Sequence, residues 1–575
     1  MKTERRNWWN RSLLGLGLAV LTSAFCFSQS QTGPADMILV NGRAFTATDA
    51  RPFAEAVAIK GDKILAVDTT EKISELAGSA TKRIDLHGRV VIPGMMDTHI
   101  HYYGVPVPGR LDIDFGEPMP SCAKVLQMVE EKVRTMPPGK VLTGNMGIEA
   151  FFDPRCTPAE LDRIAPAHAV VLTGPTPHVG MLNRAAVTKF KVDTSALPPL
   201  AGWYGKDMNS KRWDGVVHNS AFLALATKLI TDGTEDDERL HKFFLQEAKY
   251  GVTSNTFLEY DPGPRIAQLA RVNAPNRVRI VPFAQYQTGP TRRALEHPAV
   301  PQHLAERVTV AGQKWLLDGT PIERSAALRL PYADDPKTSG RVDYPEGEIG
   351  TILREALQQD QPLMMHAVGD RTAEVLFTEM DNAGGEKVWA KRRVRVEHGD
   401  GVVNDLIPRA KRLGVIVAVN PMHFDADTGN LLRQRFGSER AEVMLPCRSL
   451  LDGGVPVVIA SDGGFGEPDL NPFLNIQMAT TYPSRPRDAI SREQALIAYT
   501  RTPAYSEFTD DRLGTLEPGK LADLAVLSRD IFKVPSEELP TIESELTIIG
   551  GKIVYSRNPA ELAGGRTSSF AVDNK

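Results

Sequence analysis

The sequence predicts an α/β fold: a TIM (β/α)8 barrel with a composite β-sandwich domain built from both termini. Three observations lead to this prediction. The middle of the chain alternates apolar, strand-like runs with helical patterns, both ends are rich in short strands broken by Gly and Asp, and the 575 residues exceed what one hydrophobic core usually serves. Together they indicate a large central barrel joined to a smaller β domain.

The two ends of the chain share one style of sequence. Each contains short β-rich runs separated by turn residues, at residues 37–42, 56–64, 89–92, 522–527 and 546–555. We therefore expect one β-sandwich assembled from residues 36–92 and 505–556. The barrel of residues 93–504 is then inserted between the two parts, and residues 557–575 form a C-terminal tail.

The middle of the chain contains eight expected strands. The first ends near His99, and the others lie at residues 251–256, 278–283, 309–317, 363–366, 394–398, 415–420 and 457–462. Helical patterns such as residues 350–359 and 404–413 separate several of them, which predicts a parallel barrel. Residues 105–245 are too long for a simple connection, so we expect a structured insertion between barrel strands 1 and 2.

The N-terminus has the pattern of a secretory signal. Basic residues precede the apolar run of residues 13–27, and small polar residues follow it. We expect a signal peptide of residues 1–28 and a periplasmic or secreted protein without stable membrane insertion after cleavage. An uncleaved anchor is the alternative, and the sequence leaves open Tat export through Arg5-Arg6 or a lipoprotein attached at Cys26.

Charge and cysteine content narrow the possible partners. A net charge of −4 gives no reason to expect nucleic acid as a partner. The sequence has four cysteines but no CxxC, which argues against a thiolate metal site. Cys122 and Cys156 could form a disulfide in an oxidising compartment, and the sequence leaves this open. It also leaves open whether the chain forms a homo-oligomer.

The strongest local signal is the pair His99 and His101 in the run Pro93-Gly-Met-Met-Asp-Thr-His-Ile-His. Residues two apart in a strand point the same way, so the two imidazoles can hold one metal ion. Two histidines on one strand face are also common as ordinary hydrogen-bonded side chains. The pair therefore needs support from the other strands.

That support comes from the carboxyl ends of four further strands, where barrel enzymes place their catalytic residues. These ends carry Lys314, His366, His398 and Asp462. An ammonium group repels cations, but a Lys314 carbamylated by carbon dioxide would offer an anionic oxygen and could bridge two ions. The alternative is a barrel-lining lysine beside a single ion.

These residues and their flanks resemble the amidohydrolase superfamily, and in particular its amidohydrolase 3 branch, which includes N-substituted formamide deformylases. The matching runs are residues 91–101, Trp315-Leu-Leu-Asp-Gly, His366-Ala-Val-Gly-Asp-Arg, Arg395-Val-Glu-His and residues 514–524. The resemblance covers roughly residues 36–556 and is specific only when the motifs are taken together.

The resemblance implies a metal-dependent hydrolase acting on a small molecule. The bond cleaved would be a non-peptide or N-acyl carbon–nitrogen bond in an amide, formamide or cyclic amide. His99, His101 and Asp462 would hold one zinc ion, His366 and His398 a second, and carbamylated Lys314 would bridge them. Metal-activated hydroxide would attack the carbonyl, with Asp462 as general base and then general acid.

Three further residues are candidates for substrate binding. His178 lies in a run similar to a substrate-side motif of the branch, although Thr176 and Pro177 replace its usual Asp-Gly. His423 ends the seventh strand, and Arg371 follows His366. Each also has an ordinary structural interpretation: a polar residue closing the insertion, a hydrogen bond to a loop, and a surface ion pair, respectively.

Two other functions remain compatible with the sequence. One is a mononuclear deaminase or a hydrolase of another bond, which uses a similar barrel mouth with fewer ligands. The other is a non-catalytic binding protein of the periplasm. The number of metal ions per chain separates the first from a two-ion hydrolase, and the effect of Asp462→Asn tests the second.

Overall fold

A computed structural model describes residues 33–559 of the chain, with short stretches left out. These stretches are residues 103–109, 115, 117–119, 196–197, 199–200, 207–212, 223, 226–236, 285–296, 360, 425, 464–469 and 484. The expected signal peptide of residues 1–28 and most of the expected tail lie outside the described residues.

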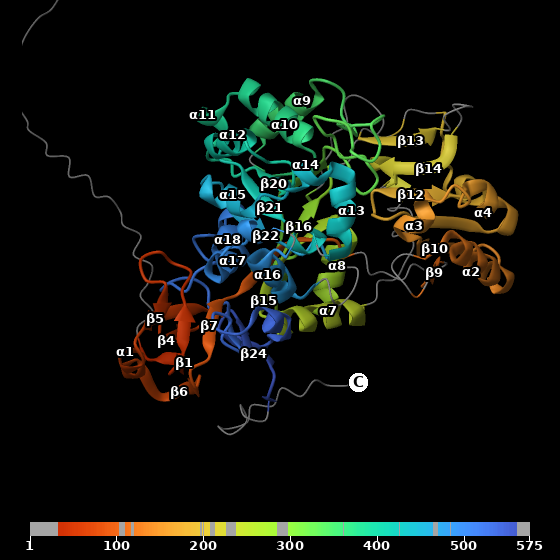
Figure 1. Ribbon diagram of the computed structural model, residues 1–575. Helices are drawn as coiled ribbons and strands as arrows, with labels where there is room; N and C mark the ends of the chain where they lie inside the picture. Colours follow the sequence, from red (N-terminus) through yellow and green to blue (C-terminus); the bar gives the residue numbers. More distant parts are fainter. Residues whose placement is uncertain are drawn as a thin grey trace, which may run out of the picture.

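Strands from both ends of the chain form two sheets at one side of the molecule (Figure 1). The N-terminal elements are β1 (Ala35–Val40), β2 (Arg43–Phe45), β3 (Phe53–Ala54), β4 (Ala56–Lys60), β5 (Lys63–Asp68), α1 (Thr70–Glu75), β6 (Ala77–Asp85) and β7 (Val90–Pro93). The C-terminal elements are β23 (Leu524–Leu527), η5 (Ser536–Thr541), β24 (Ser544–Ile549) and β25 (Lys552–Ser556).

The sheet order shows how the two ends combine. One sheet runs β5-β4-β1-β6, and the other runs β25-β24-β23-β7-β2-β3. Antiparallel pairing of β23 with β7 places Val526 opposite Val91. Side chains from both ends, among them Leu39 and Leu524, are buried in one apolar cluster. The exact domain limits given above stay a prediction.

The barrel region follows the expected alternation. Its strands are β8 (Met95–Ile100), β15 (Val252–Glu259), β16 (Arg277–Pro282), β17 (Val308–Val310), β18 (Gln313–Leu316), β19 (Leu363–Ala367), β20 (Arg395–His398), β21 (Ile416–Val419) and β22 (Val457–Ile459). Its larger helices are α7 (Asp237–Lys249), α8 (Pro262–Val272), α9 (Glu348–Gln358), α10 (Asp370–Asn382), α12 (Leu406–Leu413), α13 (Ala426–Phe436), α16 (Pro472–Thr481) and α17 (Arg492–Tyr499).

Shorter helical segments complete this region. They are η1 (Gln302–Leu304), α11 (Glu386–Trp389), η2 (Pro421–Phe424), α14 (Ser438–Ala441), α15 (Cys447–Asp452), η4 (Pro486–Asp488) and α18 (Arg501–Ser506). The strands are mostly buried on both faces, as expected for a parallel sheet covered by helices.

The parallel strands fall into two sheets, not one continuous ladder. The first has the order β17-β16-β15-β8 and the second β18-β19-β20-β21-β22. Isolated parallel bridges join them at both seams, Ile100 to Gly463 and Phe283 to Lys314. We call these two joints between the sheets the seams. Each bridge includes a predicted metal ligand or a residue next to one, so the seams and the expected site lie at the same end of the strands.

The fourth expected strand differs from the prediction because it is broken in two. Gly312 separates β17 from β18 and has φ +94°, a conformation that residues with a side chain rarely adopt. Its backbone N–H donates to the side chain of Gln361 at 2.8 Å. The chain resumes at β18, which pairs with β19 and carries Lys314.

The expected insertion is a separate α/β layer on the far side of the barrel from the terminal sheets (Figure 1). Its elements are β9 (Arg110–Ile113), α2 (Cys122–Thr135), β10 (Val141–Asn145), α3 (Gly147–Phe152), α4 (Pro158–Ile164), β11 (Ala169–Thr173), β12 (Val179–Leu182), α5 (Arg184–Phe190), β13 (Gly202–Lys206) and β14 (Trp213–Asn219). They form one sheet in the order β13-β14-β12-β11-β10-β9.

Helix α2 illustrates why this segment folds. The Ser121 side chain caps its first turn by accepting from the Lys124 backbone N–H. Cys122, Val125, Val129 and Val133 repeat every three or four residues and are all buried in the insertion's own apolar cluster. The insertion therefore has a core of its own.

The cysteines of the described region are free thiols. Cys122 and Cys156 are buried in the core of the insertion, and Cys447 is buried in the barrel region. Burial raises the pKa of the Cys156 thiol, as does the neighbouring Cys122. Their thiols therefore face each other without being joined in this structure.

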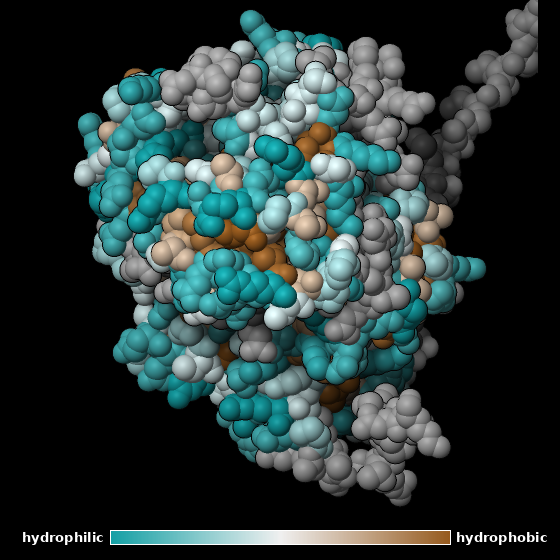
Figure 2. All heavy atoms as spheres, turned by 90° about the vertical axis from the view of Figure 1, so that its right-hand side faces the viewer, coloured by the Kyte–Doolittle hydropathy of each residue, from teal (hydrophilic) through white to brown (hydrophobic). Residues whose placement is uncertain are grey.

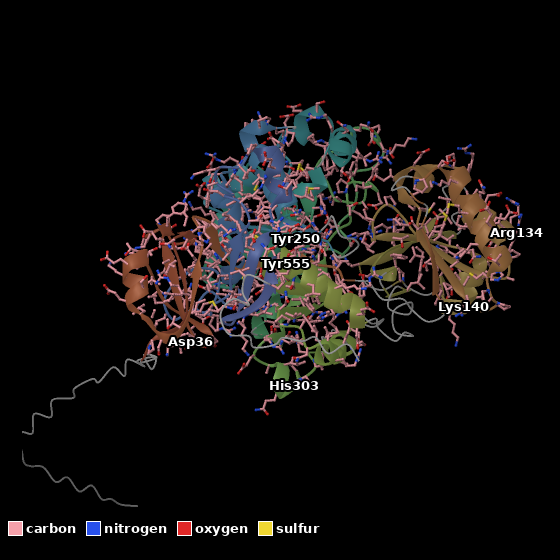
Figure 3. All side chains as sticks on the ribbon, turned by 90° about the horizontal axis from the view of Figure 1, so that it is seen from below. Asp36, Arg134, Lys140, Tyr250, His303 and Tyr555 are labelled. Atoms are coloured by element: carbon pink, nitrogen blue, oxygen red, sulfur yellow. The ribbon has the colours of Figure 1, made fainter. Side chains whose placement is uncertain are left out.

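Two further views show the surface of the molecule and the positions of labelled side chains on it. In Figure 2, hydrophobic residues gather in a band across the middle of a mostly hydrophilic face. In Figure 3, Arg134 and Lys140 lie at the outer end of the insertion, whereas Tyr250 and Tyr555 lie in the region where α7 of the barrel contacts β25 of the terminal sheets. No helix within the described ranges is long and apolar enough to cross a membrane.

Candidate metal centre

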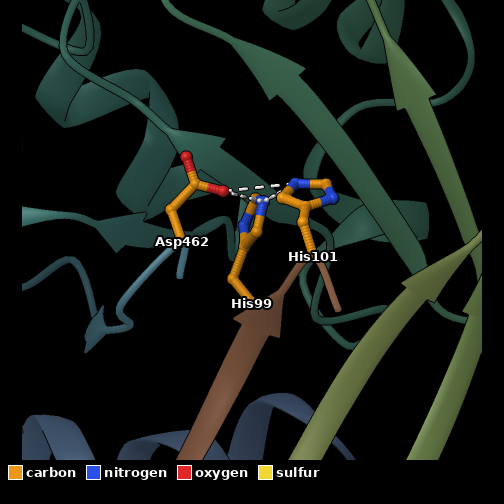
Figure 4. Close-up of side chains that lie close together, drawn as sticks. All are labelled: His99, His101 and Asp462. Carbon is orange, nitrogen blue, oxygen red and sulfur yellow. Dashed lines mark hydrogen bonds and ion pairs between the residues drawn. The ribbon is translucent and has the colours of Figure 1, made fainter. Parts of the chain in front are cut away.

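The core of the site is formed by His99, His101 and Asp462 (Figure 4). His99 Nε2 and His101 Nε2 are 3.2 Å apart, and each lies 3.2 Å from Asp462 Oδ1. Backbone hydrogen bonds fix these positions: Asp462 N–H donates to the carbonyl of His99, and His101 N–H donates to that of Gly463. The ends of the first and eighth strands thus hold the three side chains together.

This arrangement fits a divalent metal ion. Ligand atoms at 2.0–2.1 Å from a tetrahedral zinc ion lie about 3.3 Å from one another, close to the three separations observed here. Asp462 Oδ1 is buried and, among the residues that the structure describes, has no hydrogen-bond partner. Two imidazole nitrogens and one carboxylate oxygen therefore converge on a common point.

Lys314 is the next side chain at this point. It stands on β18, is 1 % exposed, and its Nζ lies 3.2 Å from His99 Nε2. Burial lowers the pKa of Lys314 to about 8, although the charges of Glu397 and Asp462 act in the opposite direction. The amine thus lies beside the three converging ligand atoms.

His366 and His398 form the other side of the site. They lie at the carboxyl ends of β19 and β20, and both are buried. Their ring centroids are 4.6 Å apart. His398 also has its centroid 5.0 Å from that of His99, and its Nδ1 lies 2.9 Å from Asn420 Oδ1. The structure therefore gathers all six predicted ligands around one barrel mouth.

Burial favours the neutral form of these histidines. It lowers the pKa of His101 to about 4 and holds the pKa values of His366 and His398 well below the usual range. Burial would raise the pKa of Asp462, but the neighbouring histidines, His99 first, hold it well below its usual value. Neutral imidazoles and an ionised carboxylate are the forms that bind a metal.

The three candidate substrate residues differ in position. His423 is half-exposed, and its Nε2 lies 3.4 Å from Asp462 Oδ2. His178 reaches the site from the insertion, with its ring centroid 4.9 Å from that of His366. Arg371 is exposed at the start of α10 and, within the described residues, makes no hydrogen bond or ion pair with the six predicted ligands.

A family model described as "Amidohydrolase family" matches residues 82–555, most of the chain. This chain belongs to the amidohydrolase family. The match confirms the resemblance deduced from the motifs, and the amidohydrolase is a hydrolase that acts on carbon–nitrogen bonds.

Curated relatives span nearly the whole amidohydrolase. Protein LONG AFTER FAR-RED 3 of Arabidopsis thaliana is 26 % identical, covering 91 % of this chain and 92 % of the relative. Putative amidohydrolase YtcJ of Bacillus subtilis is 26 % identical over 88 % and 96 %, respectively. N-substituted formamide deformylase of Arthrobacter pascens is 25 % identical over 91 % and 98 %.

A solved structure agrees in fold. An uncharacterized metal-dependent hydrolase from Pyrococcus horikoshii matches with a TM-score of 0.63 at 22 % identity, over 87 % of this chain and 99 % of the other. Together with the family match, this likeness indicates a TIM-barrel-type α/β fold for the amidohydrolase.

Sequence reasoning missed a buried carboxylate behind His99. Glu397 Oε2 lies 2.5 Å from His99 Nδ1, and its Oε1 accepts from Arg395 Nε at 2.5 Å. Arg395 also donates to the carbonyl of Thr98, which ties β20 to β8. A carboxylate on the outer nitrogen of a metal-ligating imidazole fixes its tautomer and orientation. The signal was present in Arg395-Val-Glu-His, where Glu397 precedes a predicted ligand.

Proposed function

We propose that this amidohydrolase hydrolyses a non-peptide or N-acyl carbon–nitrogen bond in an amide, formamide or cyclic amide. The observation that carries the proposal is the convergence of His99 Nε2, His101 Nε2 and Asp462 Oδ1 at 3.2 Å from one another. When bound, a divalent ion supplies Lewis acidity, lowering the pKa of water from ~15.7 towards ~7 and polarising a carbonyl.

Asp462 is suited to move the proton in this reaction. Its Oδ1 faces His99 and His101, whereas its Oδ2 lies 3.4 Å from His423 Nε2 and 3.9 Å from His398 Nδ1. We assign Oδ2 to take the proton from water and pass it to the leaving nitrogen. The half-exposed His423 then hydrogen-bonds the oxygen on which negative charge develops.

We further propose that the site holds two zinc ions. His99, His101 and Asp462 would hold one, and His366 and His398 would hold the other. Lys314 Nζ lies 3.2 Å from His99 Nε2, and a carbamylated Lys314 would supply the ligand shared by the two ions. Carbamylation joins the amine nitrogen to the carbon of carbon dioxide and releases one proton to solvent. A carbamate would account for a buried lysine among the predicted histidine ligands.

The choice of substrate class is supported by one relative. The Arthrobacter pascens protein is named as an N-substituted formamide deformylase and aligns over almost its whole length. We propose formamides, N-acyl amines and cyclic amides as the first compounds to test. His178 and His423 are the side chains best placed to contact them, and Arg371 stays a weaker candidate.

Metal analysis combined with a substrate panel tests the proposal. Protein prepared with zinc and bicarbonate is expected to contain two zinc ions per chain and to hydrolyse at least one formamide, N-acyl amino acid or cyclic amide. Chelation is expected to abolish that activity, and zinc to restore it. Active protein free of transition metal would overturn the proposal.

A single-ion enzyme is the specific alternative, because His99, His101 and Asp462 alone offer three ligand atoms that could hold one metal ion. It predicts one ion per chain irrespective of bicarbonate. The two-ion proposal instead predicts that leaving out bicarbonate lowers the metal content from two ions towards one.

We also propose, from the sequence of residues 1–28, that the protein is exported to the periplasm or secreted. Cell fractionation with sequencing of the mature N-terminus tests this. A full-length protein retained in the cytosolic fraction would contradict it.

A further inference from the structure

His178 is attached to the barrel through a chain of two hydrogen bonds. Its Nδ1 lies 2.8 Å from Asn219 Oδ1, and Asn219 Nδ2 donates to Asp343 Oδ2. His178 and Asn219 belong to the insertion, whereas Asp343 follows barrel strand β18 and its N–H donates to the carbonyl of Leu317. The relay therefore runs from the insertion to the barrel.

The middle member of the relay is held firmly. Asn219 is 1 % exposed, has φ +44°, and its backbone N–H donates to the carbonyl of His178 at 2.7 Å. An asparagine tolerates this left-handed conformation better than most residues. The Asp343 side chain has no exposed surface, and Arg341 Nε lies 3.5 Å from its Oδ1.

The relay determines which nitrogen of His178 carries the proton. The Asn219 NH2 group donates to Asp343, so the Asn219 carbonyl oxygen is the atom that faces His178 and can only accept. Nδ1 of a neutral His178 must then be the N–H donor, which leaves a lone pair on Nε2. Within the described residues, Nε2 makes no hydrogen bond, and the ring lies 4.9 Å from His366.

We propose that Asp343 and Asn219 are positioning residues that present His178 Nε2 to the substrate as a hydrogen-bond acceptor. This inference rests on the proposed hydrolase function for its consequence, which is substrate choice. An acceptor beside the metal site favours an amide or formamide that carries an N–H on the scissile nitrogen. It disfavours an analogue in which that hydrogen is replaced by methyl.

The tautomer is measurable without any activity. Long-range proton–nitrogen spectra of zinc-loaded protein labelled with 15N-histidine are expected to show His178 protonated at Nδ1 and unprotonated at Nε2. The signal is assigned by its loss in His178→Gln. Burial raises the pKa of Asp343 well above its usual value, and a protonated Asp343 that donated to the Asn219 oxygen would reverse the relay. An Nε2–H tautomer would therefore overturn the inference.

A variant tests the part played by Asp343. Asp343→Asn removes the group that fixes the direction of Asn219, so both tautomers of His178 are expected. Unchanged Nδ1–H tautomer in this variant would overturn the assignment of Asp343 as a positioning residue.

The consequence for substrate choice is tested with formanilide and N-methylformanilide. Wild-type protein is expected to prefer formanilide on the order of 10- to 100-fold in kcat/KM, because a half-buried acceptor that the bound substrate covers without offering a donor is costly. His178→Phe should remove this preference with zinc content unchanged, and His178→Gln should retain part of it through its amide oxygen. His168→Phe, in the same insertion, is the matched control.

The outcomes separate this inference from the function on which it depends. Equal loss of both activities in His178→Phe, or loss of a zinc ion, would overturn the acceptor role. If wild-type protein hydrolyses neither compound and none of the wider panel, the proposed function fails, while the nitrogen spectra still decide the relay.

Discussion

The barrel and the insertion contribute to the same site in different ways. The barrel supplies six predicted ligands from strand ends, where backbone pairing sets each position. The insertion supplies His178 from the start of β12, and its position depends on side-chain hydrogen bonds to Asn219 and Asp343. This difference predicts that barrel substitutions change metal binding, whereas insertion substitutions change substrate choice.

The largest effect should come from Asp462→Asn. Loss of the carboxylate removes one metal ligand and the proposed proton carrier, so we expect kcat/KM to fall on the order of 10³-fold or more. Steady-state kinetics and zinc analysis measure this. Asp452→Asn, at an exposed helical ion pair, is the control. Activity within tenfold of wild type would show that Asp462 has neither role.

Lys314→Met tests the bridging role next. The variant cannot be carbamylated but fills a similar volume, so we expect zinc per chain to fall from two ions to one. Mass spectrometry of metal content, with and without bicarbonate, provides the measurement. Exposed Lys391→Met should keep two ions. Two ions in Lys314→Met would exclude the bridge.

Glu397→Gln, on the barrel side of the site, should lower the affinity for zinc moderately. The amide keeps the shape but not the charge that orients His99, and loss of such a partner typically costs 10- to 100-fold in metal affinity. Competition with a zinc-binding dye measures the affinity. Glu493→Gln on the exposed side of α17 is the control. Unchanged affinity would mean that Glu397 serves only the hydrogen bond to Arg395.

The smallest effect on the metal site is expected from the core of the insertion. Leu161→Ala should destabilise the insertion by about 2–5 kcal/mol, because Leu161 is 1 % exposed in its apolar cluster. Zinc content should not change. Leu376→Ala, equally buried in α10, should instead destabilise the barrel. Chemical denaturation followed by limited proteolysis distinguishes the regions, and zinc loss in Leu161→Ala would show that they fold as one unit.

The predicted ligands at the strand ends could be found from the sequence because each lies within or just after a recognisable strand. His99 and His101 lie two apart, and Lys314, His366, His398 and Asp462 each follow an apolar run, so parallel topology alone brings them together. The alternation of strands and helices predicted the barrel for the same reason, since each pattern is local in the sequence. The break at Gly312 was less visible, since one glycine in an apolar run is compatible with an unbroken strand.

The supporting residues were not predictable because their partners are distant in sequence. Glu397 reaches His99 across 298 positions, and Asn219 reaches Asp343 across 124. Glu397 at least precedes the predicted ligand His398, whereas nothing in a single sequence distinguishes Asn219 or Asp343 from ordinary surface residues.

The two seams between the parallel sheets link metal binding to the stability of the fold. His99 and His101 belong to one sheet, and the other four predicted ligands belong to or follow strands of the second. Metal ions held by both sets, as we propose, would connect the two sheets, so metal binding would also stabilise the folded protein. At a free zinc concentration of 1,000 times Kd, such linkage contributes about 4 kcal/mol. Metal supply would then set the amount of folded enzyme as well as its activity.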